Sequence, residues 1–228
     1  MLLLAIDTSG RQGSIALARA GEAAGDDTDV EVVETSPLTG GTFSAQLIPQ
    51  IAGLLSAQGF TSNDIDAFAV GSGPGSFTGL RIGLAAVKAL AEVLAKPIVA
   101  VSLLETCVFA SGAMGKVMAV LDAGRGDVYA GQYESPAAST EYPRELMLTR
   151  NEFLEHAKDW KVVTPDLVLA EFATAAGLSV TTLSPISASE VARLGWQKIR
   201  RGETVTPEQL EANYIRRTDA EMIEKSGA

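Results

Sequence analysis

The chain is poor in the residues from which redox and metal sites are most often built. Its 228 residues include one cysteine, Cys107, and one histidine, His156. A single cysteine excludes an intramolecular disulfide and fits a reducing compartment, so a cytoplasmic location is expected. A single histidine excludes a zinc site made of several histidines, and no metal is expected. We interpret His156 as an exposed bystander and Cys107, beside apolar neighbours, as a buried and inert thiol.

Positive charge is scarce as well. There are 18 Lys and Arg residues against 28 Asp and Glu residues, which gives a formal net charge of −10. A protein that binds nucleic acid by itself normally presents a basic face, so this balance disfavours an autonomous RNA- or DNA-binding module. No apolar run approaches the ~20 residues that span a bilayer. The apolar start reaches Asp7 at once and lacks a basic region, so neither a signal peptide nor a membrane partner is expected.

Hydrophobic residues, in contrast, make up 46% of the chain, enough for a real core. In the first half their spacing predicts three strands, then a helix, a strand, a second helix and a further strand. The predicted elements are residues 2–6, 14–19, 30–35, 43–55, 67–70, 80–94 and 98–101. This is the element order of an RNase H-like lobe. Pro49 lies inside the first predicted helix and is expected to bend it or to mark a restart.

The second half begins in the same way and then loses its pattern. We predict strands at 117–121, 128–133 and 167–170 and helices at 102–111, 151–157 and 189–199. Two lobes in series indicate an α/β protein of the actin, Hsp70 and sugar-kinase architecture with a degenerate second lobe. The expected domains are an N-terminal lobe at 1–101, a C-terminal lobe at 102–212, and a segment at 213–228 that packs back on the first lobe.

A glycine-rich loop, Gly71–Gly83, joins a predicted strand to the second predicted helix. Such a loop brings backbone N–H groups to one point, where they can hold an anion or let the backbone pack closely. Ser76 stands where a Rossmann fingerprint needs its third glycine. Thr78, Gly79 and Leu80 do not supply the Gly-Lys-Ser/Thr of a Walker A loop. Both the anion and the packing interpretations remain open from these residues.

Two turns are candidates for nucleotide binding. Asp7, Thr8 and Ser9 follow the first strand, and Asp122 and Gly124 follow the first strand of the second lobe. In ATP-using proteins of this architecture such turns meet metal and phosphate. The same residue types are also ordinary turn formers. An ATP-dependent kinase or carbamoyltransferase that uses Asp7 and Asp122 is therefore an alternative function.

The second predicted helix, residues 80–94, carries two apolar stripes. The first stripe consists of Leu80, Leu84, Val87, Ala91 and Leu94. The second consists of Ile82, Ala85, Ala86, Ala89 and Val93. A helix that is apolar on most of its circumference is buried on more than one side. Either it lies at the centre of the chain, or the small-residue stripe faces another subunit.

The run Gly71–Gly83 resembles the glycine signature of the bacterial TsaB (YeaZ) family. The segments 4–9, 120–123, 126–129 and 214–216 are also similar to that family, so the resemblance covers residues 1–135 well and the tail thinly. TsaB is similar to the enzyme TsaD, which holds its metal with a His-x-x-x-His pair. Leu103 and Cys107 stand at those two positions here. The resemblance therefore implies a protein that is not an enzyme, and it counts against a glycopeptidase activity.

The resemblance also implies a function and partners. The chain would be a non-catalytic scaffold and activator of TsaD in the complex that forms N6-threonylcarbamoyladenosine next to the anticodon of tRNAs reading codons that begin with A. TsaE, an ATPase, would join this complex, and tRNA would be contacted only through it. In isolation the chain would form a homodimer. It would hold no cofactor of its own, with ATP or ADP at the junction with TsaD.

The resemblance and the two-stripe helix together predict a partner interface. From the first helix it takes Phe43, Leu47 and Ile51, and from the second helix it takes Ile82, Ala85, Ala86, Ala89 and Val93. Phe43 stands where the family often carries a histidine.

Overall fold

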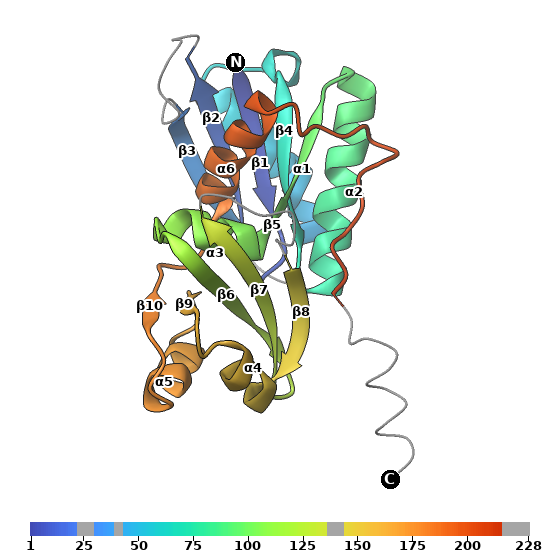
Figure 1. Cartoon of the computed structure of the whole chain (residues 1–228). Helices are drawn as coiled ribbons and strands as arrows, with labels where there is room; N and C mark the ends of the chain where they lie inside the picture. The colour runs from blue at the N-terminus through green and yellow to red at the C-terminus, as the bar shows by residue number, and fades with distance from the viewer. Residues whose placement is uncertain (22–29, 39–42, 136–143, 216–228) are drawn as a thin grey trace. The chain divides into compact units, whose positions relative to one another are not determined.

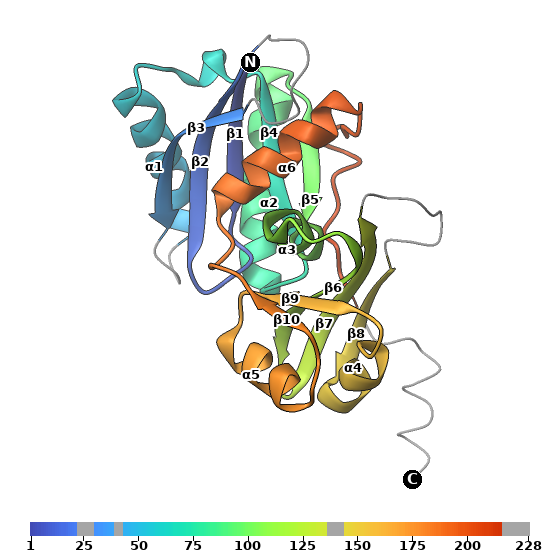
Figure 2. The same ribbon diagram turned by 60° about the vertical axis from the view of Figure 1, so that its left-hand side comes forward.

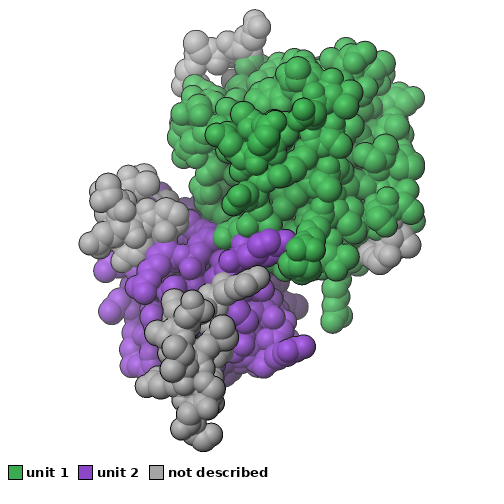
Figure 3. All heavy atoms as spheres, turned by 90° about the vertical axis from the view of Figure 1, so that its right-hand side faces the viewer, with its two compact units in different colours: residues 1–106, 186–213 green, residues 107–185, 214–228 purple. Residues whose placement is uncertain are grey.

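Two five-stranded mixed sheets form the framework of the protein in the computed structural model (Figure 1). The structure describes residues 1–21, 30–38, 43–135 and 144–215. The chain divides into two compact units, which Figure 3 shows in different colours. Unit 1 comprises residues 1–106 and 186–213, and unit 2 comprises 107–185 and the residues from 214 onward.

Unit 1 holds the first sheet, whose strand order is β3-β2-β1-β4-β5. Its strands are β1 (Leu2–Asp7), β2 (Gly13–Ala20), β3 (Val30–Leu38), β4 (Ala67–Gly73) and β5 (Ile98–Ser102). Strands β1, β2 and β3 pair antiparallel, while β4 pairs parallel with both β1 and β5. This order and these directions are those of an RNase H-like lobe, as the sequence predicts.

Helices cover both faces of the first sheet. Helices α1 (Phe43–Ala57) and α2 (Phe77–Leu94) pack against each other on one face, and α6 (Ala188–Arg200) crosses the other (Figure 2). The main core lies under α1 and α2, where Leu4 and Ile6 meet the buried side chains of both helices. Helix α6 comes close to the sheet because it carries Gly195, whose Cβ would lie 2.7 Å from the Cβ of Ala69.

Unit 2 repeats the strand topology of unit 1 with shorter helices. Its elements are β6 (Gly115–Gly124), β7 (Asp127–Ser135), β8 (Arg144–Thr149), α4 (Arg150–His156), β9 (Lys161–Thr164), α5 (Leu167–Ala175) and β10 (Val180–Thr182). The sheet order is β10-β9-β6-β7-β8, with β6, β7 and β8 antiparallel and β9 parallel to β6 and β10. If the strands of unit 2 are numbered from β6, the order read from β8 to β10 is third, second, first, fourth and fifth strand. The first sheet has the same order. The predicted two-lobe α/β architecture is confirmed.

Several local predictions need correction. Residues 167–170, predicted as a strand, begin helix α5, because Asp166 accepts hydrogen bonds from the N–H groups of Val168 and Leu169 and caps the helix. The short strands β8, β9 and β10 were not predicted. Helix α1 continues through Pro49 without a restart. The 3₁₀ turn Ser62–Asp64 was also not predicted, whereas α3 (Leu103–Ser111) confirms the helix predicted at 102–111.

The expected domain limits also differ from the compact units. Residues 186–213 pack with unit 1, not with the second lobe, because α6 lies on the first sheet. Ser14 Oγ accepts the N–H of Ala188 at 2.8 Å, and the hydroxyls of Thr35 and Ser189 lie 2.7 Å apart, which fixes the start of α6. The expected packing of 213–228 falls mostly outside the described residues.

Candidate functional site

The glycine loop packs against the turn that follows β1. Gly75, Gly79 and Gly83 recur at every fourth position, and all three face that turn. A Cβ at Gly79 would lie 2.0 Å from the Thr8 carbonyl oxygen, and one at Gly83 would lie 2.4 Å from Thr8 Oγ1. A Cβ at Gly75 would lie 2.7 Å from the Ser9 carbonyl oxygen. No side chain fits at these distances, so the glycines are required by the close packing of two backbones.

Hydrogen bonds join the same two segments. The Thr8 hydroxyl donates to the Gly79 carbonyl oxygen at 2.7 Å, and the N–H of Ser76 donates to the Ser9 carbonyl oxygen at 2.7 Å. Ser76 Oγ caps α2 by accepting the N–H of Gly79 at 3.3 Å. Two N–H groups that could have faced an anion at the start of α2, those of Ser76 and Gly79, therefore already have acceptors within the protein. The geometry favours the packing interpretation of the loop.

The first predicted nucleotide turn is enclosed. Asp7, Thr8 and Ser9 are 5%, 1% and 6% exposed. The carboxylate of Asp7 accepts the N–H of Ser9 at 2.9 Å, and burial raises the pKa of Asp7 despite that bond and one from the Ser9 side chain. Gly71 makes room for this carboxylate, because a Cβ there would lie 2.9 Å from Asp7 Oδ1.

The second predicted nucleotide turn lies in unit 2. Asp122 is exposed near the end of β6, and Gly124 begins the turn to β7 with a φ of +77°. The nucleotide-binding roles of these residues and of Asp7, Thr8 and Ser9 stay predictions. Among the described residues, no group of three or more His, Cys, Asp and Glu side chains could hold a metal ion. Nor is any described helix long and apolar enough to cross a membrane.

The lone histidine and the lone cysteine lie where the sequence places them. His156 is exposed at the end of α4, and Cys107 is fully buried in α3. Leu103, four residues before Cys107, is also buried.

The outer face of α2 exposes apolar side chains. Ala85 and Ala89 are exposed, and Val93 one turn further along is 82% exposed. At the start of the helix the ring of Phe77 is 49% exposed, and the guanidinium carbon of Arg81 lies 3.7 Å from its centroid. The cation thus lies over the face of the aromatic ring. A strip of small and apolar residues runs along the helix at four-residue spacing.

The outer face of α1 continues this surface. None of the 15 residues of α1 is charged. Ile48 is 49% exposed, and Ala45 and Ala52 are exposed beside it. Because α1 and α2 pack side by side on one face of the sheet, their outer faces form one surface with few charges. We call it the docking surface, and it consists of Ala45, Ile48, Ala52, Phe77, Arg81, Ala85, Ala89 and Val93.

This surface differs in part from the predicted interface. Phe43, Leu47 and Ile51 belong to the core of unit 1, since each is no more than 6% exposed. Ile82 and Ala86 are partly buried against that core, so only Ala85, Ala89 and Val93 of the predicted set are exposed. Ile48 and Phe77 were missed. The available signal was that α1 carries no charge on any face and has more large apolar side chains than one buried face can hold.

Comparisons with known proteins agree with this architecture. Residues 38–157, just over half of the chain, match the family model of TsaD, tRNA N6-adenosine threonylcarbamoyltransferase. The chain is 29% identical to the tRNA threonylcarbamoyladenosine biosynthesis protein TsaB of Escherichia coli over 231 residues, which cover 95% of each chain. It is 38% identical to the TsaB of Bacillus subtilis over 136 residues, which cover 59% of this chain and 56% of the relative. Among solved structures, YeaZ from Pseudomonas aeruginosa superposes with a TM-score of 0.69 at 27% identity, covering 93% of this chain and 100% of that one.

Proposed function

The chain belongs to the TsaB (YeaZ) family of tRNA threonylcarbamoyladenosine biosynthesis proteins, which is related to TsaD, and on this premise we propose that it is a non-catalytic subunit that docks on TsaD. Docking would stabilise the active conformation of TsaD, because a partner that binds one conformation more tightly shifts the population toward it. TsaE would join the pair, and tRNA and nucleotide would meet the chain only within that complex.

The observation that carries this proposal is the docking surface. Exposed Ile48, Phe77 and Val93 on two adjacent helices form an apolar area of the kind that marks protein interaction sites. Ala85 and Ala89 lie between them and are small enough to let a partner helix approach closely. Arg81 stacks on Phe77, and arginine and aromatic residues are enriched at the centres of protein interfaces.

The rest of the chain supports a role without catalysis. The resemblance to TsaD would place metal-binding histidines at two positions of α3. Those positions hold Leu103 and Cys107, which are 5% and 0% exposed. Both side chains are packed into the protein, Leu103 has no atom that can ligate a metal, and Cys107 offers one buried thiol in place of a pair of imidazoles.

Association with TsaD can be measured directly. We expect the purified chain and the TsaD of the same organism to form a complex whose mass by light scattering is the sum of the two subunits. Ala89→Arg should abolish the complex, because it inserts a long charged side chain into an apolar interface. Without TsaD the same surface would pair two copies of the chain, and Ala89→Arg should reduce this homodimer to a monomer.

A matched control is Ala175→Arg, which places the same side chain on an exposed alanine of α5. This variant should bind TsaD as the unsubstituted chain does. If Ala89→Arg bound as well as Ala175→Arg, the docking surface would lie elsewhere.

A further inference from the structure

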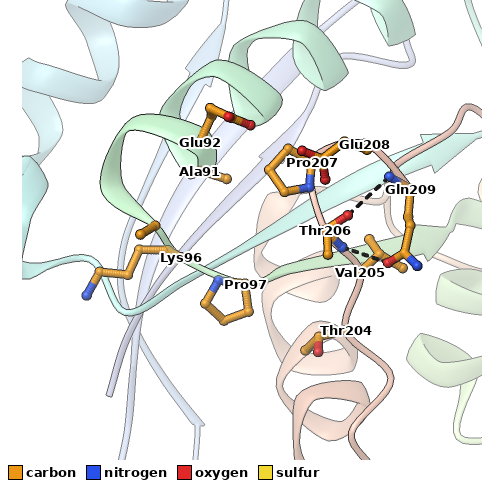
Figure 4. Close-up of a pocket in the computed structure, with 11 residues that line it drawn as sticks. Ala91, Glu92, Lys96, Pro97, Thr204, Val205, Thr206, Pro207, Glu208 and Gln209 are labelled. Carbon is orange, nitrogen blue, oxygen red and sulfur yellow. Dashed lines mark hydrogen bonds between the residues drawn. The ribbon is translucent and has the colours of Figure 1, made fainter.

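A groove lies beside the docking surface, between the C-terminal end of α2 and the segment that follows α6 (Figure 4). We call residues 204–213 of that segment the strap. The groove has a volume of about 460 Å³, and all of its lining residues belong to unit 1. Its opening adjoins the docking surface, because Glu92 of the groove is followed in the sequence by the exposed Val93.

The strap is a fixed wall of this groove. Val205 and Ile98 exchange two backbone hydrogen bonds of 2.8 and 3.3 Å, which attach the strap to the edge strand β5. Leu210 is 1% exposed and belongs to the core of unit 1. The N–H of Asn213 donates to the Ser72 carbonyl oxygen at 2.8 Å. The groove is therefore preformed, so a ligand would not have to order it.

Apolar residues make up about half of the groove's lining. Ala91 and Pro97 line one side, and Val205 and Pro207 line the other. Thr206 and Gln209 bond to each other across a strap turn, the N–H of Thr206 to Gln209 Oε1 at 3.0 Å and the N–H of Gln209 to Thr206 Oγ1 at 3.4 Å. Gln209 Oε1 and Thr206 Oγ1 thus already accept hydrogen bonds within the strap.

The charge in the groove is negative on balance. The carboxylates of Glu92 and Glu208 lie along it, whereas Lys96 extends away from the strap (Figure 4). The ammonium of Lys96 lies 3.8 Å from the Asp66 carboxylate. A hydrogen bond from the Thr206 side chain lowers the pKa of Glu208, and the charge of Lys88 adds to this, so Glu208 is ionised at neutral pH. Both glutamates are exposed and can accept a cation.

Apolar residues on both walls, with one carboxylate on each wall, match a long basic side chain, whose aliphatic stem packs against apolar groups while its head meets the charges. Resting on the proposed function, we propose that the groove receives a lysine or arginine side chain from the TsaD that sits on the docking surface. The groove would then fix the direction in which the partner docks, since it lies along only one edge of that surface.

The test compares Glu92→Gln/Glu208→Gln with the control Glu31→Gln/Glu34→Gln. The control removes two exposed carboxylates from β3 of the same unit. The dissociation constant for TsaD is measured by calorimetry at low and high salt. We expect the groove variant to bind about tenfold more weakly at ~50 mM salt and within about twofold of the unsubstituted chain at ~500 mM, where charges are screened. The control should match the unsubstituted chain at both.

Failure of this inference can be told from failure of the proposed function. If Ala89→Arg abolishes the complex while the two double variants bind equally, the groove holds no basic side chain and the docking surface stands. If Ala89→Arg leaves the complex intact, the docking surface itself is refuted.

A carbodiimide provides a second measurement, because it joins carboxylates to nearby lysines. Crosslinks from Glu92 or Glu208 to a TsaD lysine would support the inference, and crosslinks from these residues to a second copy of this chain instead would overturn it.

Discussion

Among single residues, two helical glycines, Gly79 of α2 and Gly53 of α1, are expected to change the stability in opposite directions when replaced by alanine. At Gly79 a methyl group would lie 2.0 Å from the Thr8 carbonyl oxygen, whereas at Gly53 in α1 nothing lies within 4 Å of the added carbon. We expect Gly79→Ala to destabilise the chain by about 3 kcal/mol or more. Gly53→Ala should stabilise it by about 0.5–1 kcal/mol, because alanine is the better helix former. Urea unfolding measures both, and equal effects would contradict the close packing of loop and turn.

The buried carboxyl of Asp7 makes a prediction about pH. Burial raises its pKa above the value of 3.8 in the unfolded chain. As the pH rises, the Asp7 carboxyl therefore ionises in the unfolded chain before it ionises in the folded chain. Below the unfolded pKa this group favours the folded state, and it loses that contribution as the pH rises through the folded pKa. Asp7→Asn removes the ionisation and keeps an oxygen to accept the N–H of Ser9. The variant should melt higher than the unsubstituted chain at about pH 7, with a smaller difference near pH 4.

Thermal unfolding at the two pH values measures this effect. A difference in melting temperature that stayed constant with pH would contradict it. The same variant also tests the nucleotide alternative. Micromolar affinity for Mg-ATP that Asp7→Asn abolished would show a nucleotide site at this turn and would refute a purely structural role for it.

The sequence reveals the glycine loop but not every exposed residue around it. The spacing of Gly75, Gly79 and Gly83 shows a helix face without side chains, and contact with the turn after β1 follows from the fold. The lack of charge in α1 indicates that some large apolar side chains face outward but not which ones, because no charged face marks the solvent side. Phe43 and Ile48 are both large and apolar, and only packing decides that the first is buried and the second exposed.

Among the elements, the strap depends on one buried side chain. Leu210 is 1% exposed in the core of unit 1, so Leu210→Ala should cost about 2–5 kcal/mol through lost burial and the cavity that remains. Leu167→Ala is the matched control, since Leu167 is 67% exposed, and it should cost no more than about 0.5 kcal/mol. Urea unfolding gives both values. Amide exchange at Val205 should also rise in Leu210→Ala, and unchanged protection there would show that Leu210 does not hold the strap.

The elements also show where sequence patterns fail. The apolar run 167–170 fits a strand or a helix equally well over so short a length. The Asp166 cap was the local signal for the helix, since its carboxylate accepts two N–H groups of the first turn. Strands β9 and β10, with four and three residues, are too short to display an alternation.

In the whole molecule, the two units share one strand order, and the element order of the first half was enough to predict it. The place of α6 was not predictable in the same way. It follows the last strand of unit 2 in the chain yet covers the first sheet, through the hydrogen bond from the Ala188 N–H to Ser14 and the close approach at Gly195. Such contacts join residues far apart in the sequence, and hydrophobic periodicity reports only on near neighbours.

The central claim is that the chain supports tRNA modification by docking on TsaD through α1 and α2. The most direct test measures N6-threonylcarbamoyladenosine by mass spectrometry of tRNA nucleosides from cells depleted of the chain and supplied with a variant at equal abundance. The account predicts that Ala89→Arg leaves the modification as low as in depleted cells, while Ala175→Arg restores it fully. An unchanged level of the modified nucleoside with Ala89→Arg would contradict the account.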